Sequence, residues 1–420
     1  MGHIRQIPQS SSILEAANTI VTSEPFRPIQ YLGSKLRVIK QICSATTELV
    51  GESGTVADLF SGSTVVAQSL ASRGYKVSAV DVELYSNIFA QALLGIGKRE
   101  SAELSMDMLE NPNTFEVFGE ASTHWAELAE AEALLIRDAD GTALSDFYDT
   151  LPLAWTDPQN AHYGRVSTPD QESAFGRAPL LTILYSGRYF GVEQTLLMDQ
   201  YIHSIQNLWA RGRISEWERA AYLTAVMHAA SKAVHSAGKH FAQPLNGKKT
   251  GDRQFGHKRL MEDRRVSIRT AVSDCLSAIN QIAYQDSPRH HSYHMSAEQF
   301  CSEPPLKADM FYLDPPYTAQ QYSRFYHILN VICTYRFPHV VVDGLITQGI
   351  YGADRYKSAF SSRRSALPTL TGIIENANQN RTALLISYSD SAAGSDGNAR
   401  MISLEDLLDA CRRNYGNARV

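Results

Sequence analysis

The sequence predicts an α/β fold in which a Rossmann-like parallel sheet is interrupted by a long and mostly helical insertion. Two short apolar runs, Thr55–Phe60 and Lys76–Val80, flank a helical pattern, and this order is typical of a βαβ unit with parallel strands. Apolar runs of this kind return at Met310–Leu313 and Ala383–Ser387. The long stretch between lacks strand patterns, so we expect one α/β domain whose two halves are separated by an insertion.

The chain divides into an arm, a discontinuous domain and the insertion. Residues 1–24 are expected to form an N-terminal arm, and residues 25–100 and 290–420 the α/β domain. Residues 101–289 form the insertion. A chain of 420 residues is long enough to bury the large core that such an architecture requires. The last residues, Tyr415–Val420, are expected to begin a further strand.

Helices are expected around the strands and along most of the insertion. Gly74 follows the first βαβ helix and is well placed to cap its C-terminus. In the insertion, Ser215 and Glu218 form a capping-box pattern at the start of a long helix, whereas residues 155–180 are rich in Pro, Gly and Ser and predict a loop. The helical patterns cover Leu36–Val50, Thr64–Arg73, residues 100–147, Glu193–Trp209 and Ser215–Ala237.

The composition is that of an ordinary globular protein, with 44% hydrophobic and 20% charged residues. A net charge of −5 argues against a protein that coats nucleic acid by bulk attraction, although a local basic surface remains compatible with it. The five cysteines are far apart and form no CxxC pair, which is typical of reduced thiols in a cytoplasm. No apolar run reaches the ~18 residues of a membrane span, and the N-terminus lacks the apolar core of a signal peptide. We expect a cytoplasmic protein.

The histidines His290, His291 and His294 form the densest group of their kind. No cysteine or acidic residue stands at ligand spacing from them. We therefore expect a solvated polar loop there and no metal site in the protein.

The stretch Ala57–Thr64, ADLFSGS followed by threonine, predicts a ligand-binding turn. A strand leads through Ser61 and Gly62 into a helix, so that backbone amides point outward at a helix N-terminus. Asp81 ends the next strand, where an acid can accept hydrogen bonds from both ribose hydroxyls of a nucleoside cofactor. Because the dinucleotide fingerprint GxGxxG is absent, a pyrophosphate-bearing cofactor is disfavoured and S-adenosylmethionine fits better. The alternative is an ordinary strand–turn–helix without a ligand.

Two further motifs frame this turn. In Tyr31–Lys35, YLGSK, a glycine permits close backbone approach and a lysine offers a cation to a carboxylate or phosphate, although a surface turn is the alternative. In Phe311–Tyr317, FYLDPPY, the prolines must end the strand because they cannot donate to a sheet ladder. Asp314 is therefore expected at the carboxyl edge of the sheet, where open α/β sheets bind their ligands.

YLGSK, ADLFSGS and DPPY, in this order, resemble the D12-class, Dam-like N6-adenine DNA methyltransferases. The resemblance extends over Glu193–Ala237, Gly238–Pro244 and Gln321–Asn330. It implies an S-adenosylmethionine-dependent methyltransferase sheet and a DNA target-recognition role for the insertion. The implied catalytic residues are Asp314, Pro315, Pro316 and Tyr317, and the implied cofactor-binding residues are Tyr31, Lys35, Asp58, Phe60, Ser61, Gly62, Asp81 and Asp314.

The sequence departs from the family pattern at two positions. Thr64 stands where the family usually has a glycine, and Ser296 stands where an aspartate often helps to fix the target base. The DPPY motif nevertheless suits the implied chemistry, because adenine's exocyclic amine is a poor nucleophile. Asp314 and the carbonyl of Pro315 can each accept one amino hydrogen and aim the nitrogen lone pair at a methyl group. Tyr317 can stack on a base swung out of the duplex.

The resulting hypothesis is a site-specific adenine-N6 methyltransferase acting on double-stranded DNA in a bacterial restriction-modification or phage-defence system, with cognate restriction or defence subunits as further partners. Cytosine N4 or RNA adenine are alternative acceptors, and a non-catalytic DNA-binding subunit is the alternative of another class. Cytosine-C5 chemistry is disfavoured because the sequence has no Pro-Cys pair to supply the nucleophile.

Residues 232–269 are expected to bind DNA, because they hold ten Lys or Arg against three Asp or Glu. A solvated charged face is the alternative reading of such a run. A smaller basic cluster follows the DPPY strand. The expected contacts are Lys239, Lys248, Lys249, Arg253, Lys258 and Arg259 in the first group, and Arg355, Lys357, Arg363 and Arg364 in the second.

Overall fold

The structure, a computed structural model, describes residues 24–99, 102–110, 120–154, 179–245, 253–282, 290–303, 308–339, 341–342, 345–346, 349–388 and 399–416. The expected N-terminal arm, apart from its last residue, and the loop predicted at 155–180, apart from its last two residues, lie outside these ranges.

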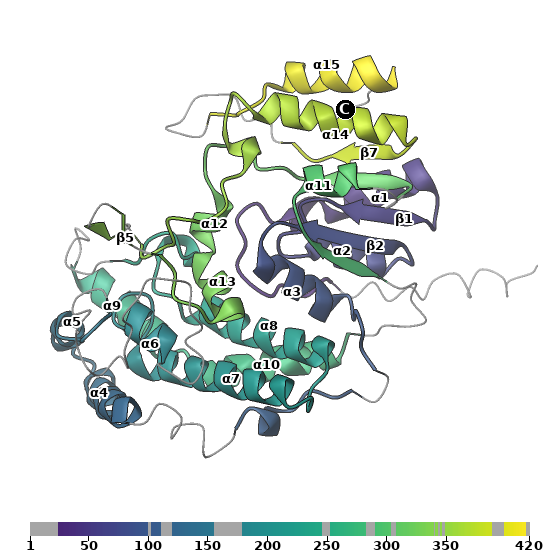
Figure 1. The fold of residues 1–420 in the computed structure, drawn as a ribbon. Coiled ribbons are helices and arrows are strands. Elements are labelled where there is room, and N and C mark those ends of the chain that lie inside the picture. Colours follow the sequence, from purple (N-terminus) through teal and green to yellow (C-terminus); the bar gives the residue numbers. More distant parts are fainter. Residues whose placement is uncertain are drawn as a thin grey trace, which may run out of the picture.

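The centre of the fold is a parallel five-stranded sheet in the order β3-β2-β1-β4-β7 (Figure 1). The predicted βαβ unit is confirmed, since β1 and β2 pair in parallel on either side of α2, Val65–Ala71. β1 also pairs with β4, so that Asp58 lies opposite Tyr312 and the two strands end side by side. The strands are β1, Thr55–Asp58; β2, Lys76–Asp81; β3, His291–His294; β4, Met310–Leu313; and β7, Ala383–Ile386.

Both faces of the sheet are covered by helices, as the continuous apolar strands require. Side chains along β4 alternate: Met310 and Tyr312 enter the core under α1 and α2, whereas Phe311 and Leu313 enter the core under α11, α14 and α15. Figure 1 shows α14 and α15 stacked beyond β7. The covering helices are α1, Ile39–Val50; α11, Ala297–Ser302; α14, Ala366–Gln379; and α15, Leu404–Tyr415.

The insertion is helical, and it shares a core with the sheet domain. The long helix α8 packs on α3, which directly follows β2, and on α13, which follows the DPPY motif. The predicted capping box is present, with Ser215 Oγ accepting a hydrogen bond from the Glu218 N–H. The described α-helices of the insertion are α4, Glu120–Arg137; α5, Gly141–Asp149; α6, Leu180–Tyr185; α7, Val192–Ala210; α8, Glu216–Ala233; α9, Arg253–Arg264; and α10, Ile268–Asn280. Outside the insertion lie α3, Leu84–Leu93; α12, Tyr322–Phe325; and α13, His327–Thr334.

The polar loop expected at His290–His294 is a wrong prediction. His291–His294 is the edge strand β3, and it pairs in parallel with Ser78–Asp81 of β2. The Val77 N–H donates to Nδ1 of His290, and burial lowers the pKa of that imidazole to about 4, so the ring is neutral at pH 7. Backbone pairing with β2 stabilises a segment whose own sequence is too polar to predict a strand.

The strand expected to begin at Tyr415 is also wrong at that residue, because Tyr415 is the last residue of α15. Its hydroxyl donates to the Thr382 carbonyl next to β7, which ties the helix to the sheet. Residues 417–420 lie outside the described ranges. None of the described helices combines the length and the apolar character that crossing a membrane requires.

Candidate active site

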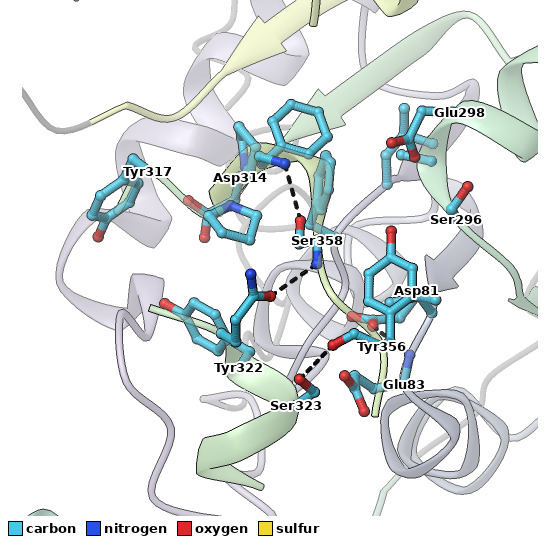
Figure 2. Close-up of a pocket in the computed structure, with 18 of the residues that line it drawn as sticks. Asp81, Glu83, Ser296, Glu298, Asp314, Tyr317, Tyr322, Ser323, Tyr356 and Ser358 are labelled. Atoms are coloured by element: carbon cyan, nitrogen blue, oxygen red, sulfur yellow. Dashed lines mark hydrogen bonds between the residues drawn. The ribbon is translucent and has the colours of Figure 1, made fainter. Parts of the chain in front are cut away.

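A cleft of about 760 Å³, including solvent at its mouth, opens where β1, β2 and β4 end (Figure 2). It contains the predicted residues from all three motifs, which places them at the carboxyl edge of the sheet as expected. A smaller pocket of about 300 Å³ adjoins it, and Tyr31, Phe60 and Asp314 line both. The cleft contains Asp81, Pro315, Pro316 and Tyr317, and the pocket contains Lys35, Asp58, Ser61 and Gly62.

The turn after β1 is shaped by a close contact between two motifs. Gly62 has a φ of 47°, and a Cβ at this position would lie 2.9 Å from Cζ of Tyr31. Only glycine therefore permits the tyrosine of YLGSK to pack on the turn. The departure at Thr64 has a backbone consequence, because its φ of 62° lies in the left-handed region that glycine adopts most easily. The threonine side chain is fully buried and its hydroxyl accepts from Gln68 Nε2.

The Asp81 carboxylate is fixed by two backbone amides. Oδ2 accepts from the Gly62 N–H at 2.8 Å, and Oδ1 accepts from the Glu83 N–H at 2.9 Å. Burial raises the pKa of Asp81, and these two hydrogen bonds oppose that rise. The carboxylate is thus held at the cleft by backbone amides of the turn after β1 and of the residue before α3.

Glu83 is a cleft residue that the sequence reasoning missed. It precedes α3 and its side chain, only 6% exposed, accepts a hydrogen bond from Asn330 Nδ2 at 2.6 Å. Burial raises the pKa of Glu83 to about 7; the nearby Asp81 adds to the rise and the hydrogen bond from Asn330 opposes it. Its position two residues after the strand-ending acid was the only signal in the sequence.

Asp314 forms an ion pair with Lys35, whose Nζ lies 2.5 Å from Oδ2. Lys35 also donates to the Gly33 carbonyl at 3.0 Å, so its ammonium is oriented by both YLGSK and DPPY. Burial raises the pKa of Asp314 and the lysine lowers it. Oδ1 of Asp314 is buried without a hydrogen-bond partner in the described part of the chain. This oxygen is therefore available to a donor on a ligand.

Asp58, at the end of β1, is the second buried acid with an open oxygen. Its side chain is 1% exposed, and Oδ1 has no hydrogen-bond partner among the described residues. Burial and, to a smaller extent, the charge on Asp314 raise the pKa of Asp58 to about 8. Because Asp58 and Lys35 line the same small pocket, that pocket offers a carboxyl group and an ammonium group to one ligand.

Stacked tyrosines hold the YLGSK loop against the helices after DPPY. The ring of Tyr31 lies 4.8 Å from that of Tyr326 at an angle of 10°, and 5.6 Å from that of Tyr322. The Tyr326 hydroxyl accepts from the Leu32 N–H at 2.7 Å. These contacts fix the loop that supplies Lys35.

One wall of the cleft comes from a segment to which the sequence reasoning gave no cofactor role. Tyr356 lines the cleft, and Figure 2 shows it near Asp81 and Glu83. Burial raises the pKa of Tyr356 to about 12, with Glu298 as the largest charge contribution. Ser323 Oγ donates to the Tyr356 carbonyl at 2.6 Å, so the segment is tied to α12. Nothing local in the sequence links Tyr356 to the motifs.

The match to known families covers the same motifs. Residues 31–142 and 280–347 match the D12 class N6 adenine-specific DNA methyltransferases. The two matched segments span 180 of the 420 residues and hold all three motifs. The predicted resemblance, fold class and enzyme class are confirmed at the level of the family, which uses S-adenosylmethionine and acts on DNA.

Three methyltransferases are similar to this chain at low sequence identity. Type II methyltransferase M.NlaIII of Neisseria lactamica is 21% identical over 387 residues, which are 89% of this chain and 87% of the relative. Modification methylase LlaI of Lactococcus lactis subsp. lactis is 24% identical over a stretch that covers 54% of this chain and 30% of the relative's length. Modification methylase StsI of Streptococcus sanguinis is 27% identical over a stretch that covers 30% of this chain and 17% of the relative's length. No solved structure matches significantly.

Ser296, which stands where the family often has an aspartate, caps the N-terminus of α11. Ser296 Oγ accepts from the Gln299 N–H at the start of α11, and Gln299 Oε1 accepts from the Ser296 N–H. Both Ser296 and Glu298 line the cleft. The carboxylate of Glu298 is thus present at this wall, two residues further along the chain than the family's aspartate.

The predicted DNA contacts fall into three groups. Lys239 is engaged within the protein, because its Nζ lies 2.5 Å from Oδ1 of Asp263 and also donates to two backbone carbonyls. Arg259 donates to the Ser236 carbonyl at 2.7 Å, and the Arg355 guanidinium lies 4.6 Å from the centre of the Tyr351 ring. The side chains of Lys258, Lys357, Arg363 and Arg364 are exposed. Lys248, Lys249 and the side chain of Arg253 lie outside the described residues.

Proposed function

We propose that this chain binds S-adenosylmethionine in the cleft and methylates N6 of an adenine swung out of double-stranded DNA. The observation that carries the proposal is Asp314, which is paired with Lys35 through Oδ2 and has a buried Oδ1 without a hydrogen-bond partner among the described residues. Asp314 lines the cleft that Asp81 also lines. A hydrogen-bond acceptor and a nucleoside site therefore meet in one cavity.

The charges of the cleft fit the proposed cofactor. S-adenosylmethionine carries a sulfonium, an ammonium and a carboxylate. Asp58, with its open Oδ1, suits the ammonium, and Lys35 in the same pocket suits the carboxylate. Asp81, held by two amides, suits the ribose hydroxyls. Tyr356 and Phe60 supply flat apolar walls of the same cleft.

The protein groups at the end of β4 perform the proposed activation of the base. Asp314 Oδ1 accepts one hydrogen of the adenine amine and the Pro315 carbonyl accepts the other, which directs the nitrogen lone pair away from the ring plane. The carboxylate also stabilises positive charge that develops on the nitrogen. Pro315 and Pro316 fix the backbone, and Tyr317 stacks on the base. The bound cofactor supplies an electrophilic methyl group.

The choice of target sequence is proposed to depend on the insertion and on residues 355–364, which follow the DPPY motif in the chain. The DPPY residues contact only the flipped base, so flanking bases must be read by other residues. The exposed Lys258, Lys357, Arg363 and Arg364 are suited to phosphate contacts. The names of the relatives support a modification role in a restriction-modification system.

Transfer of labelled methyl from S-adenosylmethionine to unmethylated bacterial DNA tests the proposal. Nucleoside analysis of the product should show N6-methyladenine. Asp314→Asn should lose at least about 100-fold in kcat, while the matched control Asp409→Asn, an exposed acid on α15, should retain wild-type activity. Label in N4-methylcytosine or in RNA alone would establish another acceptor, and no transfer by the wild type would establish the non-catalytic alternative.

A further inference from the structure

Tyr317, the tyrosine of DPPY, is contacted by residues that follow β7 in the chain. The Met401 N–H donates to the Tyr317 carbonyl at 3.1 Å. The ring of Tyr388, which follows β7, meets the Tyr317 ring edge-on at 5.9 Å and 73°, and its hydroxyl donates to the Ile402 carbonyl at 2.6 Å. Tyr317 is thus packed against residues that come far later in the chain.

The guanidinium of Arg400, which comes from the same part of the chain, lies over the Tyr317 ring. The Cζ atom of Arg400 lies 4.6 Å from the ring centre. Tyr317 lines the cleft and Arg400 does not. The Arg400 guanidinium therefore contacts the ring from outside the cleft, and the Lys35 Nζ atom lies 6.0 Å from the same ring centre.

The geometry points to Arg400 as a positioning residue for the target base, acting through Tyr317. This inference rests on the proposed function. A tyrosine ring has a negative face, and a cation on that face holds it in one orientation. Because the family match ends at residue 347, the likeness to the family assigns no role to Arg400.

The consequence for the reaction is geometric. A flipped base needs a flat partner at a fixed distance from Asp314 and Pro315, and Tyr317 stands only one residue beyond the two prolines. If its ring turns, the base loses its stacking partner while the acceptors of its amine stay in place. Arg400 should therefore affect the methyl-transfer step more than cofactor binding.

Steady-state kinetics on unmethylated bacterial DNA test this role with Arg400→Met, Arg400→Lys, Tyr317→Ala and the double variant Arg400→Met/Tyr317→Ala. Arg400→Met keeps an unbranched stem for packing and should lower kcat about 10-fold, the upper range of a cation–π contact. Arg400→Lys should recover part of this loss, and KM for S-adenosylmethionine should be unchanged. The double variant should be no slower than Tyr317→Ala alone. Arg413→Met, an exposed position on α15, is the matched control.

Three outcomes would overturn the role of Arg400 while leaving the proposed function intact. They are an unchanged kcat in Arg400→Met, a full multiplication of the two single losses in the double variant, or a loss confined to KM for DNA with a shallower salt dependence. The last outcome would identify a phosphate contact instead. Failure of the proposed function is distinguished by the wild type, which would then transfer no methyl group to DNA adenine, and the inference would fall with it.

Discussion

Lys35 and Asp314 form an ion pair that joins the two separate segments of the family match. Lys35 belongs to the first segment, and Asp314 ends the strand at the centre of the second. Their contact brings a cation from a loop to a carboxyl group at the sheet edge, where burial raises the pKa of Asp314 and the lysine opposes that rise.

Replacing Lys35 should shift the pH dependence of the enzyme. In Lys35→Met the pKa of Asp314 should rise, because burial acts without an opposing cation. Since the ionised acid is the acceptor for the adenine amine, the acidic limb of kcat/KM should move upward by about one pH unit or more. Lys40→Met, at an exposed position of α1, is the control. An acidic limb that does not move would separate Lys35 from the ionisation of Asp314.

Adding one methyl group at Gly62 should damage the cofactor site. In Gly62→Ala the new Cβ would collide with Tyr31, and a φ of 47° is unfavourable for alanine. The affinity for S-adenosylmethionine, measured by calorimetry, should fall at least about 10-fold because the turn and the loop must separate. Gly74→Ala also has a positive φ but meets no atom within 4 Å, so it should reduce stability without changing this affinity. Equal affinities in both variants would contradict the contact.

Asp58 should make the ligand-free protein less stable as the pH rises. Its pKa is about 8 in the folded state and close to 4 in an unfolded chain, so folding retains a proton between these values. The free energy of unfolding should therefore fall from about pH 4 to pH 8. Asp58→Asn should be more stable than the wild type at pH 8 by about 1–3 kcal/mol, the cost of an unpartnered buried polar group. Thermal unfolding at pH 5 should show no such advantage.

Glu83 should make cofactor binding depend on pH near neutrality. Its pKa of about 7 means that the carboxyl group ionises within the working range. Because the cofactor has a net positive charge, its affinity should increase as Glu83 ionises between about pH 6 and 8. Glu83→Gln should remove this increase while keeping an acceptor for Asn330. Calorimetric titrations of both proteins across this range would reveal an unaltered slope if the charge had no role.

Lys248 and Lys249 lie outside the described residues and remain predicted DNA contacts. Neutralising both should weaken binding to all sequences and reduce the log–log salt slope by up to about two units. Affinity for S-adenosylmethionine should be unchanged. Lys239→Met is an instructive comparison, because Lys239 is paired with Asp263 and its loss should lower stability more than DNA affinity. If only substitutions of Lys357, Arg363 and Arg364 change the salt slope, the DNA lies along residues 355–364.

The motifs that could be predicted are those fixed by local backbone chemistry. The prolines after Leu313 end a strand wherever they occur, and Gly62 marks a turn, so Asp314 and Asp81 could be assigned to strand ends before their contacts were known. Tyr356, Glu83 and Arg400 could not be found in this way. Their place at the site depends on packing between distant segments, and no local pattern records that packing. β3 was missed for the same reason, since β2 supplies its stabilising partner.

The core shared by α3, α8 and α13 has a consequence for how the protein unfolds. Tyr85 and Phe89 of α3 are buried in the same cluster as Leu223 and Met227 of α8. Removing the insertion would expose this apolar surface beside the cleft, where α3 follows Asp81. Sheet and insertion should therefore melt in one cooperative transition, and a sheet domain isolated by deleting residues 101–289 should aggregate rather than act as a smaller enzyme.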